Sequence, residues 1–447
     1  MAFYRNLLIV LTHGLRADAA GFSRAWPLCT PNMDKLVERG LKLTAISASP
    51  VNPGGMLSLL TGLHARQHGY LQERETIVPC EGWPGLLKAA GYHVAGVGCV
   101  STIEQVLDDC VVVDSVEVLD SSRCKYLTAT AATGLRSAVV QQRRQRLRYG
   151  PFHPDRLLME PDEDIDGFIS VQARQMLTRM PSDKPWALIV IYSGPGNELP
   201  PPTLYQDVVA PELLEEGFVP PDFTELDALA ELDYPRVMLQ RLEPHQVARI
   251  RADYLGRVSL IDYGIGRMMK TIAEREDNER TWFVLGSDHG QLLGEHGLVG
   301  HRSFLCGAVE VPVIITPPFP ASNRLPGALV SNIDVATTIA ALGGGDVPPW
   351  MTGRSLLPLL AGDTSAVDQP HTGLLSEFGQ RLLLETERYK LIMHTQTHRI
   401  LGLYDLLNDP DEKTNLIKTM TGRNVTDALR WRLGDTLMPL RAAPRHI

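Results

Sequence analysis

Histidine and aspartate side chains follow two runs of the sequence that are predicted to be buried β-strands. His13 comes shortly after the aliphatic run Leu7–Leu11, and Asp288 and His289 come shortly after Trp282–Leu285. A continuous aliphatic run is typical of a strand buried on both faces, and parallel α/β sheets build their sites at the carboxyl ends of such strands. Imidazole and carboxylate groups at that edge could ligate a metal. Alternatively, the histidines could be hydrogen-bonded to the backbone or to Asp288 without a metal.

The elements that position these residues alternate along the chain. Two more strands are predicted at 187–192 and 311–316, and helices are predicted at Met33–Arg39, Pro84–Ala90 and Gln246–Glu274. Strands that alternate with helices predict an α/β fold with a central, mostly parallel sheet flanked by helices.

The pattern changes near the end of the chain. After Gly362, short strands are predicted at Leu382–Glu385 and Tyr389–Met393, and a helix is predicted at Asp427–Leu437. We therefore expect a large N-terminal α/β domain over residues 1–362 and a small C-terminal α+β domain with an antiparallel sheet over residues 363–447.

Composition excludes several classes of protein. The chain has 447 residues with 43 Lys and Arg against 52 Asp and Glu, which gives a net charge of 43 − 52 = −9. We expect no nucleic-acid partner from this charge balance, and no membrane association, because no run approaches the roughly 20 apolar residues of a transmembrane helix. The run Leu7–Leu11 is too short for a signal peptide, and the six cysteines form no CxxC pair. These features favour a reduced cytoplasmic protein.

Several short segments occur in a fixed order over nearly the whole chain. They are Thr30-Pro31-Asn32-Met33-Asp34, Leu59-Leu60-Thr61-Gly62 with Gln67-His68-Gly69, Ser287-Asp288-His289-Gly290 with Gly294-Glu295-His296-Gly297, and Gly353-Arg354-Ser355-Leu356. In this order they resemble motifs of the sulfatase family, a branch of the alkaline-phosphatase superfamily. The resemblance implies a sulfatase-like fold, with a small C-terminal domain that closes the cleft.

The positions that carry sulfatase chemistry have changed. The resemblance aligns the family's paired metal-binding aspartates with His13 and Gly14. It aligns the cysteine or serine that becomes formylglycine with Asn52, ten residues before Gly62, and the arginine beside it with Met56. His13 and Asn52 are 52 − 13 = 39 residues apart, a spacing normal for the family, so a misalignment does not explain the loss. An amide has no thiol to oxidise and is a poor nucleophile.

A third family segment, G-K-W-H, is replaced by Gly98-Cys99-Val100-Ser101, so its lysine and histidine are also absent. We expect Cys99 to be a buried small apolar side chain rather than a reactive thiol. The late lysine of the family aligns with Arg302, which keeps a positive charge, and His301 lies beside it in the sequence.

The resemblance implies that positions 13, 52, 288 and 289 converge in one pocket. His13, Asp288 and His289 would then supply two imidazoles and a carboxylate, a set that suits zinc, iron or manganese better than calcium, with Asn52 as a neutral fourth ligand. A site without metal is slightly favoured, because Gly14 supplies no ligand and the pocket has lost charge.

Two functions are consistent with these residues. The first is a non-catalytic sulfatase-like protein, a pseudo-sulfatase, which binds a small anionic ester or another ligand in the cleft. The second is a hydrolase of sulfate or phosphate esters with an altered His/Asp metal site, in which His301 and Arg302 assist the leaving oxygen. Either protein could form a homo-oligomer, and the first could pair with an active sulfatase homologue.

Overall fold

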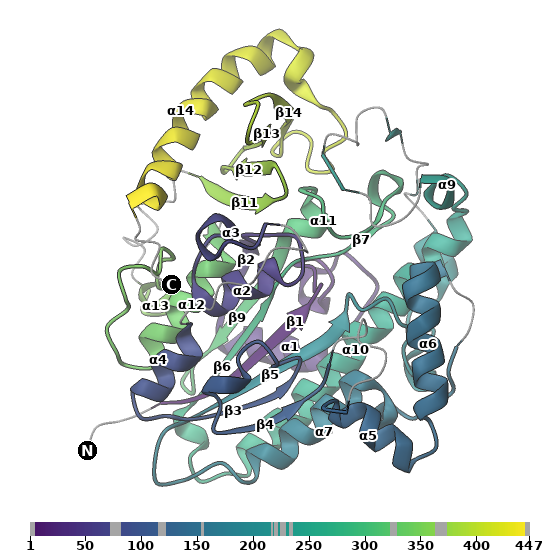
Figure 1. Ribbon diagram of the computed structural model, residues 1–447, viewed down its shortest axis with the longest axis vertical. Helices are drawn as coiled ribbons and strands as arrows, with labels where there is room; N and C mark the ends of the chain where they lie inside the picture. Colours follow the sequence, from purple (N-terminus) through teal and green to yellow (C-terminus); the bar gives the residue numbers. More distant parts are fainter. Residues whose placement is uncertain are drawn as a thin grey trace.

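The central sheet has eight strands, four of which come from the runs that the sequence predicted. The computed structural model describes residues 5–442 except 72–81, 115–121, 153–155, 216–217, 219–221, 224–228, 232–235, 322–328 and 363–372. The strand order is β10-β2-β9-β6-β1-β5-β3-β4 (Figure 1). The strands are β1 (Asn6–His13), β2 (Leu41–Ile46), β3 (His93–Gly98), β4 (Asp109–Val112), β5 (Trp186–Pro195), β6 (Thr281–Ser287), β9 (Glu310–Thr316) and β10 (Val330–Ser331).

The middle of the sheet is parallel. β1 pairs in parallel with β5 and β6, and β3 pairs in parallel with β5 and β4. β9 runs antiparallel to β2 and β6. The predicted α/β class with a mostly parallel sheet is therefore confirmed, and the carboxyl ends of β6, β1, β5 and β3 meet at one edge.

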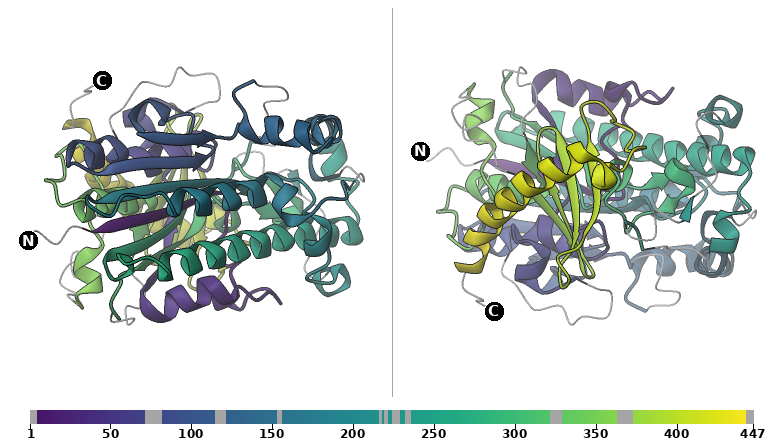
Figure 2. Two further views of the ribbon diagram at one scale, coloured as in Figure 1. Left: turned by 90° about the horizontal axis from the view of Figure 1, so that it is seen from below. Right: turned by 90° about the horizontal axis from the view of Figure 1, so that it is seen from above.

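Helices cover both faces of the sheet. Successive side chains of β1 point to opposite faces, so the strand contributes apolar side chains to a core on each side. Leu8 and Val10 pack into one core with α1 (Pro31–Arg39), α7 (Ile165–Leu177) and α10 (Pro244–Ala273). Leu7, Ile9 and Leu11 pack into a second core with α2 (Gly54–Thr61), α4 (Trp83–Ala89) and α12 (Asn332–Leu342). Figure 2 shows α10 running along one face. The three predicted helices correspond to α1, α4 and α10, with ends within a few residues.

Smaller elements complete the large domain. They are α3 (Ala65–His68), α5 (Lys125–Ala132), α6 (Arg136–Tyr149), α9 (Arg236–Leu239), α11 (Cys306–Val309) and α13 (Leu357–Leu360), with the hairpin of β7 (Leu292–Leu293) and β8 (Val299–Gly300). Among the described residues, no helix combines the length and apolar character that a transmembrane span requires.

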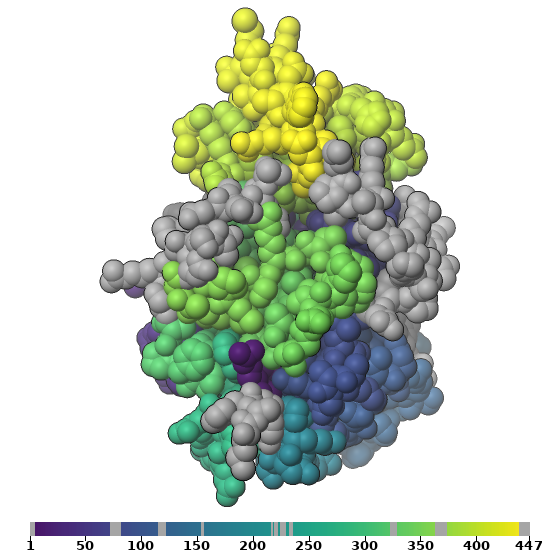
Figure 3. Space-filling model, turned by 90° about the vertical axis from the view of Figure 1, so that its left-hand side faces the viewer, coloured from purple at the N-terminus to yellow at the C-terminus, as the bar shows by residue number. Residues whose placement is uncertain are grey.

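The C-terminal part is a four-stranded antiparallel sheet with one long helix. The strands β11 (Leu374–Phe378), β12 (Arg381–Glu385), β13 (Tyr389–His394) and β14 (Ile400–Asp405) pair in sequence order. The helix α14 (Met420–Ala442) crosses this sheet (Figure 2) and is longer at both ends than the predicted helix. Figure 3 shows these residues, in yellow and yellow-green, at one end of the molecule. The predicted small α+β piece is confirmed, while the boundary at residue 362 stays a prediction.

A buried lysine links the two parts. The Lys390 ammonium on β13 is fully buried and lies 2.6 Å from Oε1 of Glu412 and 3.5 Å from Oε2 of Glu385. It also donates to the carbonyl of Phe304, which belongs to the large domain, at 2.9 Å. Burial opposes the charge, but Cys306 and the surrounding carboxylates raise the pKa of Lys390 well above its usual value. The ion cluster thus fixes the small sheet against the segment that follows the candidate site.

We expect Lys390→Met to lower the free energy of unfolding by roughly 3–5 kcal/mol, because it leaves buried carboxylates without their counter-charge. Chemical denaturation measures this change. Lys413→Met is the matched control, since the ammonium of Lys413 is 72% exposed and its loss should leave the stability essentially unchanged. A neutral Lys390→Met variant would show that the cluster does not hold the two parts together.

One histidine of the family motifs has a structural role. His68, at the end of α3, is 1% exposed. Its Nδ1 accepts the backbone N–H of Tyr70 at 3.3 Å, and its Nε2 lies 3.0 Å from the hydroxyl of Ser58. Burial, reinforced by the neighbouring His64, lowers the pKa of His68 to about 4. The ring is therefore neutral at physiological pH and joins α3 to α2.

Because the folded chain binds this proton less tightly than the unfolded chain, His68 makes the protein less stable as the pH falls below about 6.5. We expect the loss of unfolding free energy between pH 7 and pH 5 to be smaller by about 2 kcal/mol in His68→Gln than in the wild type. Urea denaturation across this range measures the difference. The exposed His245 supplies a control, since His245→Gln should keep the wild-type slope.

Candidate active site

Two adjacent strands, β1 and β6, bring His13 and Asp288 together. In the parallel pairing of β1 with β6, Thr12 lies opposite Ser287, so His13 and Asp288 emerge side by side at the carboxyl edge of the sheet. Nδ1 of His13 donates to Oδ2 of Asp288 at 2.5 Å. Burial opposes the imidazolium, but the Asp288 carboxylate outweighs burial and raises the pKa of His13 well above its usual value.

The Asp288 carboxylate is fully buried, and donors of the chain itself surround it. Its Oδ1 accepts the backbone N–H of Gly14 at 3.0 Å and that of His289 at 2.7 Å. Burial favours the neutral acid, but His289, His13 and these N–H groups hold the pKa of Asp288 well below its usual range. The carboxylate is thus charged and is satisfied by protein donors on both oxygens.

His289 and His301 form the next layer of the site. Their rings stack with centroids 4.4 Å apart and planes 13° apart. Nδ1 of His289 donates to the carbonyl of Gly290 at 2.7 Å, and its Nε2 lies 3.6 Å from Oδ2 of Asp288. Burial and the neighbouring His289 lower the pKa of His301 well below its usual value, so its ring is neutral.

A divalent cation does not fit this arrangement. The backbone N–H groups and His13 already occupy the Asp288 oxygens, and Gly14 supplies no ligand. Over the described ranges, no group of three or more His, Cys, Asp or Glu side chains has the arrangement of a metal site. The proposed ligands His13, Asp288 and His289 do lie together, but as a hydrogen-bonded cluster.

The backbone at Gly14 excludes the family's second aspartate. Gly14 has φ +79°, and a Cβ added there would lie 2.8 Å from Cα of Gly196. The two segments are joined by a hydrogen bond, in which the N–H of Gly196 donates to the carbonyl of His13 at 2.9 Å. The loop after β1 therefore packs so closely against the end of β5 that it leaves no space for a carboxylate side chain at position 14.

Asn52 and Met56, which the sequence resemblance aligns with the family's nucleophile and its arginine, lie just before α2 and within α2. Asn52 lies half-buried in the turn before α2, next to Pro50, whose carbonyl accepts the N–H of Arg302 at 3.0 Å. Met56 is 3% exposed and packs into the apolar core of that face of the sheet. The guanidinium of Arg302 lies 2.6 Å from Oε2 of Glu231. The charge that the sequence suggested for an anionic ligand is paired within the chain.

Cys99 packs against the apolar core that contains Met56, as the sequence analysis expected of a small apolar side chain. It is partly exposed and follows β3, a strand that the sequence analysis did not identify. The neighbouring Cys99 side chain helps to raise the pKa of His13. The signal for this strand in the sequence was a short apolar run followed by the polar residues Cys99 and Ser101. Two glycines in the run weaken the pattern that would predict a strand.

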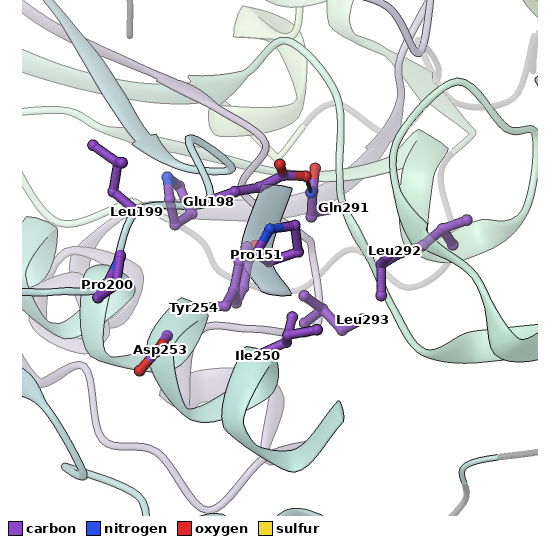
Figure 4. Close-up of a pocket in the computed structure, with 12 residues that line it drawn as sticks. Pro151, Glu198, Leu199, Pro200, Ile250, Asp253, Tyr254, Gln291, Leu292 and Leu293 are labelled. Carbon is purple, nitrogen blue, oxygen red and sulfur yellow. Dashed lines mark hydrogen bonds between the residues drawn. The ribbon is translucent and has the colours of Figure 1, made fainter. Parts of the chain in front are cut away.

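A largely apolar pocket lies behind the loop that carries Gly14. In Figure 4, Gln291 and Glu198 lie together at one side of this pocket, and Tyr254 and Ile250 project from α10. Nε2 of Gln291 donates to Glu198 at 2.9 Å, and the hydroxyl of Tyr254 donates to the carbonyl of Gly14 at 2.7 Å. The pocket wall therefore supports the same loop that holds His13 against Asp288.

The fold and the position of the site define a hydrolase-type α/β protein, and comparisons with known proteins give its family. The Sulfatase family model matches residues 5–345, and the model for the C-terminal part of N-sulphoglucosamine sulphohydrolase matches residues 294–438. The chain belongs to the sulfatase family, so the resemblance in the sequence is confirmed. Members of this family generally depend on a metal, typically calcium or magnesium.

Several relatives cover much of the chain. It is 29% identical to choline-sulfatase of Rhizobium meliloti (strain 1021) over 59% of the chain, and that match spans about half (53%) of the relative. It is 24% identical to the uncharacterized sulfatase YidJ of Escherichia coli (strain K12), over 98% of the chain and 88% of the relative.

Solved structures share the fold. The phosphonate monoester hydrolase from Silicibacter pomeroyi has a TM-score of 0.79 at 18% identity, covering 97% of this chain and 96% of that one. The structure of BT4656 in complex with D-glucosamine-2-N,6-O-disulfate has a TM-score of 0.70 at 18% identity, covering 99% of both chains.

We expect Gly14→Asp to destabilise the fold without creating a metal site, because its side chain meets Gly196 and its φ is left-handed. The expected loss is about 1–3 kcal/mol of unfolding free energy. Gly14→Ala is the matched control, with the same backbone strain and no carboxylate. In thermal melting with and without Ca²⁺ or Mg²⁺, both variants should respond alike. A melting temperature that rises with Ca²⁺ only in Gly14→Asp would contradict this account of the loop.

Proposed function

We propose that this sulfatase-family protein is a pseudo-sulfatase, which does not hydrolyse sulfate or phosphate esters by formylglycine and metal chemistry. One observation carries the proposal: the His13 imidazole pairs at 2.5 Å with the Asp288 carboxylate, in a cluster where the family would bind its cation. Sulfuryl and phosphoryl transfer need a positive centre to neutralise the charge on the transferred group. A carboxylate held by His13, Gly14 and His289 does not provide the ligands for one.

The remaining catalytic positions support the same conclusion. Asn52 carries an amide in place of an oxidisable thiol, and Met56 fills the core in place of an arginine. A substitution that restored a cysteine at position 52 would still leave Met56 in place of the arginine. In addition, Gly14 has no room for a carboxylate side chain. As the role of the pocket, we propose binding of a small anionic ester or a related ligand, with the fold as its scaffold.

One feature favours a second candidate, a metal-dependent ester hydrolase with an altered site. His13 and His289 flank a single carboxylate, and imidazoles are good ligands for zinc, iron and manganese. This hydrolase would require the His13–Asp288 hydrogen bond to open. Metal content therefore separates the two candidates.

The experiment measures metal by mass spectrometry in protein purified without added metal, for the wild type, His13→Ala and Asp288→Ala. We expect far less than one zinc, iron or manganese per chain in all three proteins. Asp288→Ala should also lose roughly 3–5 kcal/mol of stability, because it leaves His13 and the N–H donors of the loop without their acceptor.

Turnover completes the test. Aryl sulfate, phosphate monoesters and phosphate diesters should remain unhydrolysed, with or without added Ca²⁺, Mg²⁺, Zn²⁺ or Mn²⁺. Stoichiometric metal in the wild type that is lost in both variants, together with hydrolysis of any of these esters, would support the altered hydrolase and overturn the pseudo-sulfatase.

A further inference from the structure

A carboxylate of the chain occupies the guanidinium group that borders the site. The guanidinium of Arg302 lies 2.6 Å from Oε2 of Glu231. Arg302 follows His301, whose ring stacks on that of His289 with the centroids 4.4 Å apart. The backbone N–H of Arg302 donates to the carbonyl of Pro50 at 3.0 Å, which fixes its main chain. The chain thus holds a paired positive charge directly beside the stacked histidines.

The backbone that presents Glu231 is fixed on both sides. The N–H of Glu231 donates to the carbonyl of Arg302 at 3.0 Å, and Ala230 pairs with Ser303 in an antiparallel bridge. The preceding Leu229 is 1% exposed and packs in the same apolar core as side chains of β14. The Glu231 side chain, by contrast, is 49% exposed. Its carboxylate can therefore turn into solvent while its backbone stays in place.

A second ion pair, in the wall of the pocket of Figure 4, differs in exposure. Nη2 of Arg146 lies 3.5 Å from Oε2 of Glu198, whose side chain is 7% exposed and also accepts from Gln291. Separating a buried pair leaves an uncompensated charge in the interior, whereas a half-exposed carboxylate is hydrated as it turns away. Of these two pairs, Glu231 with Arg302 is the one that opens at low cost, provided that another anion replaces the carboxylate.

We propose that Glu231 is an internal competitor for the ligand, and that a tetrahedral oxyanion group binds by displacing the Glu231 carboxylate from Arg302. The inference rests on the proposed binding of an anionic ester, for which it names the receiving group and the residue that regulates it. A guanidinium presents a planar fork of N–H donors that matches two oxygens of a sulfate or phosphate group as well as those of a carboxylate.

The exchange keeps the charge of Arg302 compensated, because one anion replaces another. It also sets a threshold for the ligand. The Glu231 carboxylate is attached to the same chain and competes at a high effective concentration. The measured affinity for an oxyanion is therefore lower than the intrinsic affinity of Arg302, by the fraction of molecules in which the pair is open.

The first measurement is the Kd of inorganic sulfate, by isothermal titration calorimetry on the full-length protein at constant ionic strength and without added metal. We expect Glu231→Gln to bind sulfate about tenfold more tightly than the wild type, because the amide carries no charge to compete or to repel the anion. Glu279→Gln is the matched control. Glu279 is exposed in the turn before β6, at the opposite edge of the sheet, and its variant should keep the wild-type Kd.

The second measurement is a double-mutant cycle with Arg302→Gln. In the Glu231→Gln background, Arg302→Gln should weaken sulfate binding by about tenfold or more, because the guanidinium fork is lost. In the Arg302→Gln background, Glu231→Gln should leave the Kd unchanged. Arg302→Lys, which keeps the charge without the fork, serves if Arg302→Gln does not fold, and circular dichroism confirms the fold of each variant.

Equal sulfate affinity in the wild type and Glu231→Gln would overturn the competition and leave the proposed anionic ligand standing. A gain of affinity that survives without the Arg302 guanidinium would also overturn it, because the anion would then bind elsewhere. Sulfate binding in none of the proteins would overturn the anionic ligand and this inference together. Metal content and the turnover of sulfate and phosphate esters decide the pseudo-sulfatase independently of these results.

Discussion

The pairing of His13 with Asp288 is the interaction on which the rest of the site depends. A fully buried carboxylate is costly unless it is paired and hydrogen-bonded, and the parallel register of β1 with β6 brings its partner to it. Once the imidazole occupies one oxygen and two backbone N–H groups the other, the loop after β1 has a fixed course. That course leads Gly14 close to Gly196 and against the hydroxyl of Tyr254.

The same interaction shows how the protein itself balances the buried charge at this edge of a sulfatase fold. In an active member, a cation would balance the carboxylates at this edge of the sheet; here a single carboxylate is balanced by the protein. The fold does not rely on that edge for its hydrophobic stability, since the two apolar cores lie on the faces of the sheet and the side chains of β1 serve both. Met56, which the sequence resemblance aligns with the family's arginine, packs into one of these cores.

The C-terminal sheet is attached by a different means. The ammonium of Lys390 lies among buried carboxylates and donates a hydrogen bond to a carbonyl of the large domain. The contact between the two parts is therefore polar and directional as well as apolar. It lies near Cys306, a few residues after His301 and Arg302, in the segment that returns from the site to β9. The small domain therefore contacts the segment between the site and β9, whereas the register of β1 and β6 places His13 and Asp288 themselves.

The sequence by itself determined the family and the α/β class, because these follow from ordered motifs and from aliphatic runs such as Leu7–Leu11. It could not determine how the residues at the edge of the sheet are arranged. The hydrogen bond between His13 and Asp288, the saturation of Asp288 and the left-handed turn at Gly14 depend on strand register and on contacts between residues hundreds of positions apart. The place of Cys99 at this edge of the sheet was also decided only by the tertiary structure. The glycine-containing strand before it carries a weak pattern, and its position two strands from β1 follows from sheet order rather than from local sequence.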